Sequence, residues 1–477
     1  MQLHRKRNAK LAITTAAILS TLLLHACGGS DSADDSHGPL NPPAPIVEAE
    51  ETREQDSRNF SVDASKLPLA ALTDFPNTDR WWGVHQGAGY RIEVPANWNG
   101  KLVMWAHGYG GTGPVVSVSD PQIRAHLIKN GYAWAASSYT KNYYDVRAGV
   151  EDTNALALAF NAIAETNGRK LGTPEKIYIV GQSLGGHVAA AAIDQEALEF
   201  ANNKVNYNGA VPMCGVLGDL DLYNYFGASQ LAAQKLAGIP ANSWPTSNWN
   251  GILPQVRDSL FTTFPTQTTL LGDQYKEIVK NLTGGQRPMF EEGFAGSMNA
   301  TVWGTFGRDG TINGILNKDG YDTRKIVYQF DNDPSLSEEE KKFNETIFKL
   351  EPHPEANRLR RDGLRWFPKT NAKINIPVVT IHTLGDVYVP FSMEQIYKRR
   401  ADQEGTSKWL VQRAIRGKAH CDFTLDEQTD AFDAMVNWEQ NGVKPEGDEV
   451  LDPKVVADPA YGCKFSSPSR GSCKASS

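Results

Sequence analysis

Short, continuously apolar runs alternate along the chain with stretches whose apolar residues recur at helical spacing. A continuous apolar run is typical of a strand buried on both faces of a parallel sheet. Strands that alternate with helices predict a doubly wound, mostly parallel sheet of the α/β class. The expected strands are 90–94, 101–106, 132–136, 176–180 and 210–213, and the expected helices are 121–129, 150–164 and 185–197.

This alternation stops near residue 215 and resumes with apolar runs at 376–381 and 409–415. A connection of about 160 residues is too long for a loop and predicts an inserted domain. The insertion carries polar stretches, glycines and scattered aromatic residues. We therefore expect one sheet domain in two parts, 61–214 and 373–442, with a large cap at 215–372 and a tail at 443–477.

The N-terminus carries an export signal. A positive head, with Arg5, Lys6, Arg7 and Lys10, precedes the apolar run 11–24, which is too short to span a bilayer. The sequence Leu-His-Ala-Cys-Gly-Gly at 24–29 then resembles a bacterial lipoprotein processing site, with Cys27 as the lipidated first residue. We expect a signal peptide at 1–26, a flexible tether at 27–60 and a lipid anchor in the periplasm or outer membrane; the alternative is an ordinary secreted protein.

The charge balance excludes some partners. The 477 residues carry a net charge of −7, and no run of more than three lysines or arginines is present, so a nucleic-acid partner is not expected. Cysteine and histidine spacing typical of zinc is absent from the sequence, and we expect neither a metal nor a cofactor. The acidic stretch 331–340 predicts a helix start capped by Ser337 rather than a calcium loop, because its spacing does not match an EF-hand.

Four cysteines remain after Cys27, an even number that predicts two disulfides in an oxidising compartment. They are Cys214, Cys421, Cys463 and Cys473, and they allow three pairings. Cys463 and Cys473 are close in a tail rich in glycine, serine and proline, which favours a bond between them and leaves Cys214 with Cys421.

A candidate nucleophile stands between an expected strand and an expected helix. The segment Gly-Gln-Ser-Leu-Gly at 181–185 fits the G-x-S-x-G pattern of a serine on a strained strand-to-helix turn, and Ser183 is its centre. The pattern alone is common by chance, so its position after 176–180 carries the prediction.

A serine hydroxyl needs a base, and the base needs an acid behind it. Asp386 follows the strand 376–381, and His420 follows the strand 409–415, in the order Ser…Asp…His. The alternative for Asp386 is a turn or helix-capping residue. Asp219 and Asp221 are the reserve acids, and His107, His187 and His382 are predicted to be structural.

Backbone N–H groups would hold the oxyanion. One donor is expected from Leu184, directly after the serine. The other is expected from Tyr109, in the glycine-rich loop 107–111, where glycines let the backbone approach a substrate closely.

With these residues the chain resembles the α/β-hydrolase family from about 85 to 440, which implies Ser183 as nucleophile, Asp386 as acid and His420 as base. The step His420-Cys421 also resembles tannase and feruloyl esterase relatives, in which a disulfide ties the nucleophile's neighbour to the histidine's neighbour. Here Gln182 precedes the serine instead of a cysteine. Cys214 ends the next strand, adjacent in this fold, so a Cys214–Cys421 bond would still hold the histidine loop over the sheet.

The sequence therefore predicts an exported serine hydrolase that cleaves carboxylic esters, and the resemblance extends the expected substrates to aromatic acyl or bulky polymeric esters. An amidase or peptidase with the same three residues is the second hypothesis. A surface lipoprotein without activity on a hydrolase scaffold is the third.

Overall fold

The computed structural model describes residues 59–477 apart from 297, 306–319, 353, 355–367, 472 and 474–477. The expected signal peptide, Cys27 and nearly all of the expected tether lie outside the described residues.

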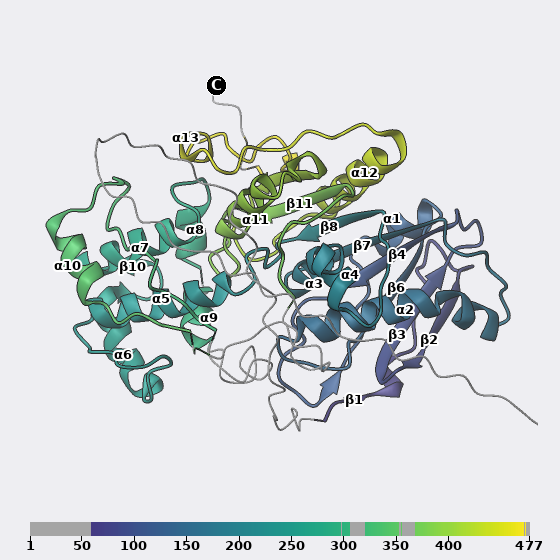
Figure 1. The fold of residues 1–477 in the computed structure, drawn as a ribbon, viewed down its shortest axis with the longest axis horizontal. Helices are drawn as coiled ribbons and strands as arrows, with labels where there is room; N and C mark the ends of the chain where they lie inside the picture. The colour runs from purple at the N-terminus through teal and green to yellow at the C-terminus, as the bar shows by residue number, and fades with distance from the viewer. Residues whose placement is uncertain are drawn as a thin grey trace, which may run out of the picture. The chain divides into compact units, whose positions relative to one another are not determined.

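A sheet of eight strands forms the centre of the described chain (Figure 1). Its order is β12-β11-β8-β7-β4-β6-β3-β2. The strands are parallel except that β3 pairs antiparallel with β2 and with β6. The strands are β2 (Asp79–His85), β3 (Ala88–Val94), β4 (Lys101–Ala106), β6 (Ala133–Ser137), β7 (Lys176–Gln182), β8 (Gly209–Met213), β11 (Val378–Thr383) and β12 (Leu410–Ile415). This order, with its antiparallel edge, is that of the α/β-hydrolase fold, so the predicted fold class is confirmed.

Helices cover both faces of the sheet, as the alternating pattern predicts. Leu102 and Met104 of β4 pack in one apolar cluster with α2 (Val146–Thr166), α3 (Leu184–Ala192) and α11 (Ser392–Gln403). Val103 and Trp105 of the same strand pack in another, with α1 (Arg124–Lys129) and α12 (Leu425–Asn441). Successive side chains of one buried strand thus supply two cores, which explains the continuously apolar runs.

Two sequence expectations need correction. The helix expected at 185–197 is two helices, because α3 ends at Ala192 and the side chain of Asp194 accepts a hydrogen bond from the N–H of Glu196 (3.1 Å) to begin α4 (Gln195–Phe200). An aspartate at a helix N-cap favours a new start over continuation. The edge strand β2 was not predicted, because nearly all of its residues are exposed or half-exposed and form no apolar run.

The segment between β8 and β11 is mainly helical, and its helices group together in Figure 1. The capped start expected at Ser337 is present, with Ser337 and Glu340 forming a capping box. Aromatic residues fill the interior: Trp303 donates its indole N–H to the hydroxyl of Tyr275 (2.8 Å). The described elements are α5 (Asp221–Leu236), α6 (Trp249–Leu260), β9 (Phe261–Thr263), β10 (Gln267–Thr268), α7 (Leu270–Leu282), α8 (Phe290–Phe294), α9 (Met298–Gly304) and α10 (Glu338–Thr346).

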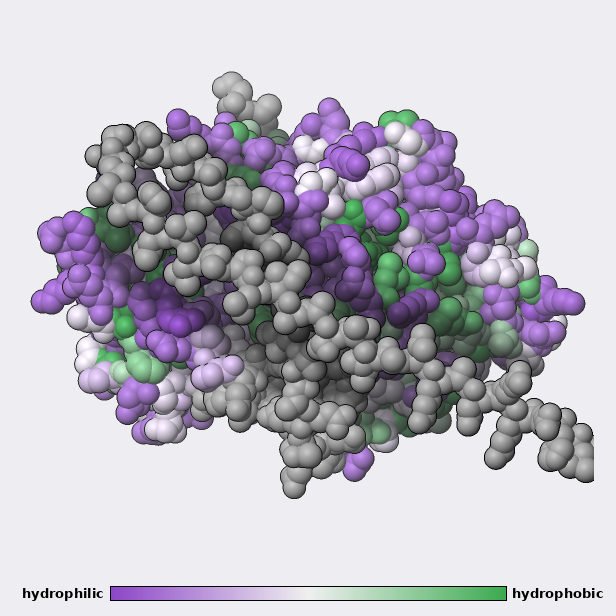
Figure 2. Space-filling view, in the orientation of Figure 1, coloured by the Kyte–Doolittle hydropathy of each residue, from purple (hydrophilic) through white to green (hydrophobic). Residues whose placement is uncertain are grey.

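Smaller elements complete the described chain: β1 (Ser61–Val62) pairs parallel with β5 (Val115–Val116), and α13 (Pro453–Val456) lies in the tail. The surface that faces the viewer in Figure 2 is hydrophilic over α10 and α12, and hydrophobic residues show mainly below α12, over the central strands of the sheet. Among the described helices, none combines the length and the apolar character that crossing a membrane requires.

Candidate active site

Ser183 occupies a strained turn between β7 and α3. Its backbone angles are φ 61° and ψ −122°, in a region that residues with a side chain rarely adopt. The motif glycines flank it because there is no room for a larger residue. A Cβ on Gly185 would lie 1.9 Å from the carbonyl oxygen of Ala106, and one on Gly181 would lie 2.0 Å from that of Gly185. The G-x-S-x-G pattern is thus a packing requirement of this turn.

Three residues from distant parts of the chain meet above the carboxyl ends of β7, β11 and β12. Nε2 of His420 lies 2.8 Å from Oγ of Ser183. Nδ1 of the same ring lies 2.5 Å from Oδ2 of Asp386. Asp386 is fully buried, whereas the His420 side chain is 17% exposed, so the carboxylate is shielded from water and the imidazole reaches the surface.

The sequence left two interpretations of Asp386, the acid of the site or a turn residue, and each one describes one of its two carboxylate oxygens. Oδ1 accepts the backbone N–H groups of Tyr388 and Val389, both at 2.9 Å, as a turn residue would. Oδ2 faces His420. The turn contacts fix the carboxylate so that its second oxygen is aimed at the imidazole.

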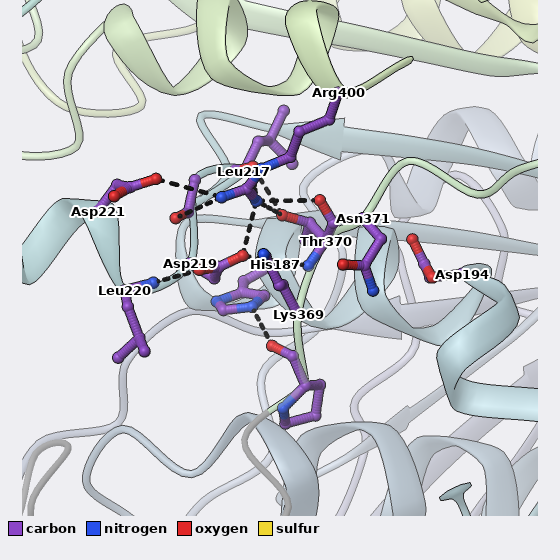
Figure 3. Close-up of polar contacts among 12 residues, drawn as sticks. His187, Asp194, Leu217, Asp219, Leu220, Asp221, Lys369, Thr370, Asn371 and Arg400 are labelled. Atoms are coloured by element: carbon purple, nitrogen blue, oxygen red, sulfur yellow. Dashed lines mark hydrogen bonds and ion pairs between the residues drawn. The ribbon is translucent and has the colours of Figure 1, made fainter. Parts of the chain in front are cut away.

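The reserve acids take part in a separate network, shown in Figure 3. Nη1 of Arg400 lies 2.6 Å from Oδ2 of Asp219, and Nη2 lies 3.1 Å from Oδ2 of Asp221. Arg400 also donates to the carbonyl oxygen of Thr370 (3.0 Å), and the Thr370 hydroxyl donates to that of Leu217 (2.6 Å). The network joins the two ends of the segment between β8 and β11.

The other candidate histidines are engaged elsewhere. Nδ1 of His107 lies 2.6 Å from the carbonyl oxygen of Gly108, and its ring stacks on Tyr139. Nε2 of His187 lies 3.0 Å from the carbonyl oxygen of Pro368, and burial lowers the pKa of the ring to about 4, although the charge of Asp219 opposes this. His382 lies inside β11 and contacts Glu394.

Both disulfides join the cysteines that the sequence favours. Cys463 pairs with Cys473 in the tail, and Cys214 pairs with Cys421, with Cα atoms 5.4 Å apart in each case. Cys214 follows Met213, whose carbonyl oxygen accepts the N–H of Ser183 (3.0 Å). The Cys214–Cys421 bond therefore ties the His420 loop to the end of β8, which also accepts the N–H of Ser183.

The sulfur atoms of this bond and the ring of His420 lie close enough together for a metal. Metal binding by cysteine needs a thiolate, and both sulfurs are consumed in the disulfide, so the group does not fit a metal ion.

The loop expected to supply an oxyanion donor lies against the nucleophile. A Cβ on Gly108 would lie 3.5 Å from Cβ of Ser183. The loop is held by Asn142, whose amide donates to the carbonyl oxygens of Gly113 (2.7 Å) and Val115 (2.9 Å). Leu184 is the first residue of α3, where the N–H has no partner within the helix. The predicted donors Tyr109 and Leu184 stay predictions, and Asn142 was not foreseen from the sequence.

Sequence reasoning also missed the residues that hold the Asp386 loop from behind. Arg287, between α7 and α8, is 2% exposed and donates to the carbonyl oxygen of Leu384 (2.7 Å). The hydroxyl of Tyr225, on α5, donates to that of Val387 (2.7 Å). Burial lowers the pKa of Arg287 to about 10, while the nearby charges of Tyr225 and Asp386 oppose the change. No sequence motif marks these residues, because their partners are backbone atoms.

Aromatic rings border the base. The ring of Tyr388 meets His420 edge-on, with centroids 5.8 Å apart, and stacks on Phe226 of α5 at 5.2 Å. Tyr223, also on α5, packs against Tyr144 at 5.4 Å. Tyr109, on the opposite loop, is 44% exposed.

Fold and site geometry together define an α/β-hydrolase fold with a Ser–His–Asp arrangement at the carboxyl ends of its strands. No family model matches the chain. A curated protein similar to it is an o-phthalyl amidase from Xanthobacter agilis, 21% identical over 408 residues, which are 75% of this chain and 86% of that protein.

Solved structures with a similar fold include an esterase from Aspergillus oryzae, with 15% identity, 77% of this chain and 81% of that chain covered, and a TM-score of 0.43. Feruloyl esterase B from the same organism is 15% identical, the match covers 79% of this chain and 85% of that chain, and the TM-score is 0.38. The acylaminoacyl peptidase of Pyrococcus horikoshii is 10% identical, the match covers 80% of this chain and 44% of that chain, and the TM-score is 0.37.

Proposed function

We propose that the protein is a serine hydrolase that cleaves carboxylic esters, with Ser183 as nucleophile, His420 as base and Asp386 as acid. One observation carries the proposal: the imidazole of His420 lies between Ser183 (2.8 Å) and Asp386 (2.5 Å). Acyl transfer to a serine hydroxyl requires this arrangement of nucleophile, base and orienting acid.

The mechanism follows from the hydrogen bonds. Asp386 accepts the Nδ1 proton of His420, which leaves Nε2 free to take the proton of Ser183 as its oxygen attacks the ester carbonyl. The N–H groups of Tyr109 and Leu184 stabilise the oxyanion. His420 then protonates the leaving alcohol, and water releases the acyl group by the same steps in reverse. The reaction needs no cofactor.

The acyl group that suits this site is a planar aromatic one. Tyr388 beside His420 and the exposed ring of Tyr109 on the oxyanion loop present aromatic surface near the nucleophile. Aromatic rings favour stacked or edge-on contacts with other rings. The relative from Xanthobacter agilis is named for an aromatic acyl group, which supports the same proposal. We expect esters with an aromatic acyl group, such as benzoyl esters, to be turned over faster than acetyl esters of the same leaving group.

An amidase is the second candidate, favoured by the name of that relative. His420 would protonate a leaving amine as readily as an alcohol, so the triad does not discriminate. Turnover of matched p-nitrophenyl esters and p-nitroanilides decides between them; a strong preference for the anilide would replace the esterase proposal.

Labelling with a fluorophosphonate probe tests whether the site is active at all. The native protein should be labelled, Ser183→Ala should not, and Ser259→Ala, on α6, should behave as the native protein. Absence of labelling in the folded native protein would favour the third hypothesis, a scaffold without activity.

We also propose that the protein is exported and lipidated at Cys27, and that the segment 215–372 acts as the cap of the site. Two disulfides suit an oxidising compartment. Metabolic labelling with palmitate should mark the native protein and not Cys27→Ala. A native chain that is secreted without label would support the ordinary signal peptide instead.

A further inference from the structure

A second histidine, His382, lies directly behind the buried acid of the site. It belongs to β11 and is fully buried. Its Nε2 is 2.8 Å from the carbonyl oxygen of Val389 and 4.0 Å from Oδ2 of Asp386. Its Nδ1 is 3.3 Å from Oε1 of Glu394, on α11. Each ring nitrogen of His382 therefore faces an oxygen.

These oxygens are acceptors. A peptide carbonyl has no proton to give, so Nε2 must donate to Val389. Oε2 of Glu394 accepts the hydroxyl of Thr380 (2.6 Å) and the side-chain amide of Gln412, and these donors stabilise the ionised carboxylate. An ionised Glu394 requires a donor at Nδ1 as well. A neutral imidazole has one N–H and satisfies only one of these two contacts.

We propose that His382 is a charged imidazolium that faces the carboxylate of Asp386 from behind and so acts as a positioning residue for the triad. Its catalytic consequence rests on the proposed function, whereas its protonation does not. The side chains then form one chain of alternating charge, in which Glu394 stabilises His382, His382 faces Asp386, and Asp386 orients His420.

The charges around His382 favour this state. Burial by itself lowers the pKa of the ring, but the hydrogen bond and charge of Glu394 and the charge of Asp386 outweigh it and raise that pKa above its ordinary value. Arg287, whose charge interacts with Asp386, is the opposing cation nearby. Tyr397 and Tyr461 lie near Glu394, and burial raises the pKa of each hydroxyl, so both tyrosines stay neutral.

His187 provides a contrast inside the same protein. It is equally buried, and its Nε2 also faces a carbonyl oxygen, that of Pro368, at 3.0 Å. Its Nδ1, however, lies 3.0 Å from the hydroxyl of Tyr144, which can donate. A neutral ring with its proton on Nε2 satisfies both contacts. Two fully buried histidines should thus differ in charge because one meets a hydroxyl where the other meets a carboxylate.

The charge on His382 has a consequence for the base. A buried carboxylate beside an imidazole favours the charged form of that ring. The positive charge of His382 offsets part of this effect of Asp386 and so favours the neutral ring that Ser183 needs as its base.

Nuclear magnetic resonance of protein with ¹⁵N-labelled histidine tests the protonation directly. At about pH 8, where an ordinary histidine with a pKa of about 6.5 is neutral, both ring nitrogens of His382 should carry protons and His187 should carry one. The His382 signal is assigned by its loss in His382→Gln or, if that variant does not fold, by contacts of its ring protons with Phe391. A singly protonated His382 would overturn the proposal whatever the catalytic activity.

The pH profile tests the consequence. In His382→Gln the acid limb of kcat/KM for p-nitrophenyl acetate should move up by about one pH unit, the size expected for one charge within ~10 Å at an effective dielectric of about 20. In Glu394→Gln it should move in the same direction by less, because a negative charge is lost together with the positive charge of His382. In His187→Gln the limb should stay in place. A uniform loss of rate without this movement would mean that His382 only packs. Doubly protonated His382 in a protein without hydrolysis would leave the charge assignment standing and refute the proposed function alone.

Discussion

At the scale of single residues, the candidate site depends on side chains whose two ends have different tasks. Asp386 uses one oxygen to hold its own turn and the other to face His420. Folding and chemistry can therefore be tested separately at this residue. A side-chain amide in its place can keep the hydrogen bonds to the turn and lose the carboxylate contact with His420.

Asp386→Asn should therefore fold normally and lose most of its activity. The amide oxygen can still accept the N–H groups of Tyr388 and Val389, but an amide in the other position selects the wrong imidazole tautomer. Loss of the orienting carboxylate lowers kcat by about 10⁴-fold in a well-studied serine protease, and we expect about 10³-fold or more here. Asp221→Asn is the matched control, and equal losses in the two variants would contradict the assignment of the acid.

Stability should respond to pH through His187. Because burial lowers its pKa to about 4 from 6.5, the folded state binds fewer protons than the unfolded state between these values. The stabilisation from the neutral ring is complete above about pH 6.5 and is lost as pH falls toward 4, by about 3 kcal/mol in all. Burial raises the pKa of Asp194 to about 7, so protonation of this residue stabilises the folded state as pH falls, opposite to the effect of His187. The contribution of His187 must therefore be measured as a difference between the native protein and a variant.

Chemical denaturation at several pH values measures this effect. The difference in unfolding free energy between the native protein and His187→Gln should shrink as pH falls from about 6.5 to 4. A difference that stays constant across this range would show that His187 is not buried as a neutral ring.

At the scale of elements, the site is held by contacts to backbone atoms that arrive from other parts of the chain. Arg287 and Tyr225, from the segment between β8 and β11, hold the carbonyl groups on both sides of Asp386. The Cys214–Cys421 bond holds the His420 loop from the sheet. Asp386 and His420 are therefore positioned by different parts of the chain.

Arg287→Lys should lower kcat by about tenfold while KM changes little. A lysine keeps the charge but lacks the planar fork that reaches Leu384, Gly285 and Thr283 together. Arg324→Lys, at an exposed ion pair, is the control. If kcat and KM of Arg287→Lys equal those of the native protein, the hydrogen bonds of Arg287 to the Asp386 loop do not contribute to catalysis.

Removal of the Cys214–Cys421 bond should reduce activity before the protein unfolds. Mild reduction, or replacement of both cysteines by alanine, frees the loop that carries His420, whereas the sheet keeps its core. Replacement of Cys463 and Cys473 is the matched control and should leave activity unchanged. Activity and far-ultraviolet circular dichroism are followed on the same samples, and their simultaneous loss would contradict the expectation.

At the scale of the whole molecule, a helical segment interrupts one sheet, and its two ends are fastened together where they leave and rejoin it. Arg400 makes this connection through Asp219, Asp221 and Thr370 (Figure 3). Asp219 and Arg400 are 6% and 16% exposed, so the pair is largely shielded from water.

Arg400→Met should cost about 3 kcal/mol of stability, because it leaves the buried carboxylate of Asp219 without its partner. Arg324→Met, which removes an exposed ion pair with Asp322, should lower the stability far less, because water screens an exposed pair. Thermal unfolding of both variants gives the comparison, and equal Tm values would refute a special role for Arg400.

The sequence alone determined the parts of this protein that depend on local pattern. Continuous apolar runs fixed most strands of the parallel sheet, since each strand is buried on both faces, and strand-end positions singled out Ser183, Asp386 and His420. Periodicity could not show that Asp194 divides one helix into two, nor reveal the edge strand β2. Tertiary structure alone decided which atoms hold these residues: Arg287 and Tyr225 bind backbone carbonyls, which leave no mark in a sequence. The charge of His382 likewise depends on which partners surround its ring, because hydrogen bonds and burial at one point in space come from residues far apart along the chain.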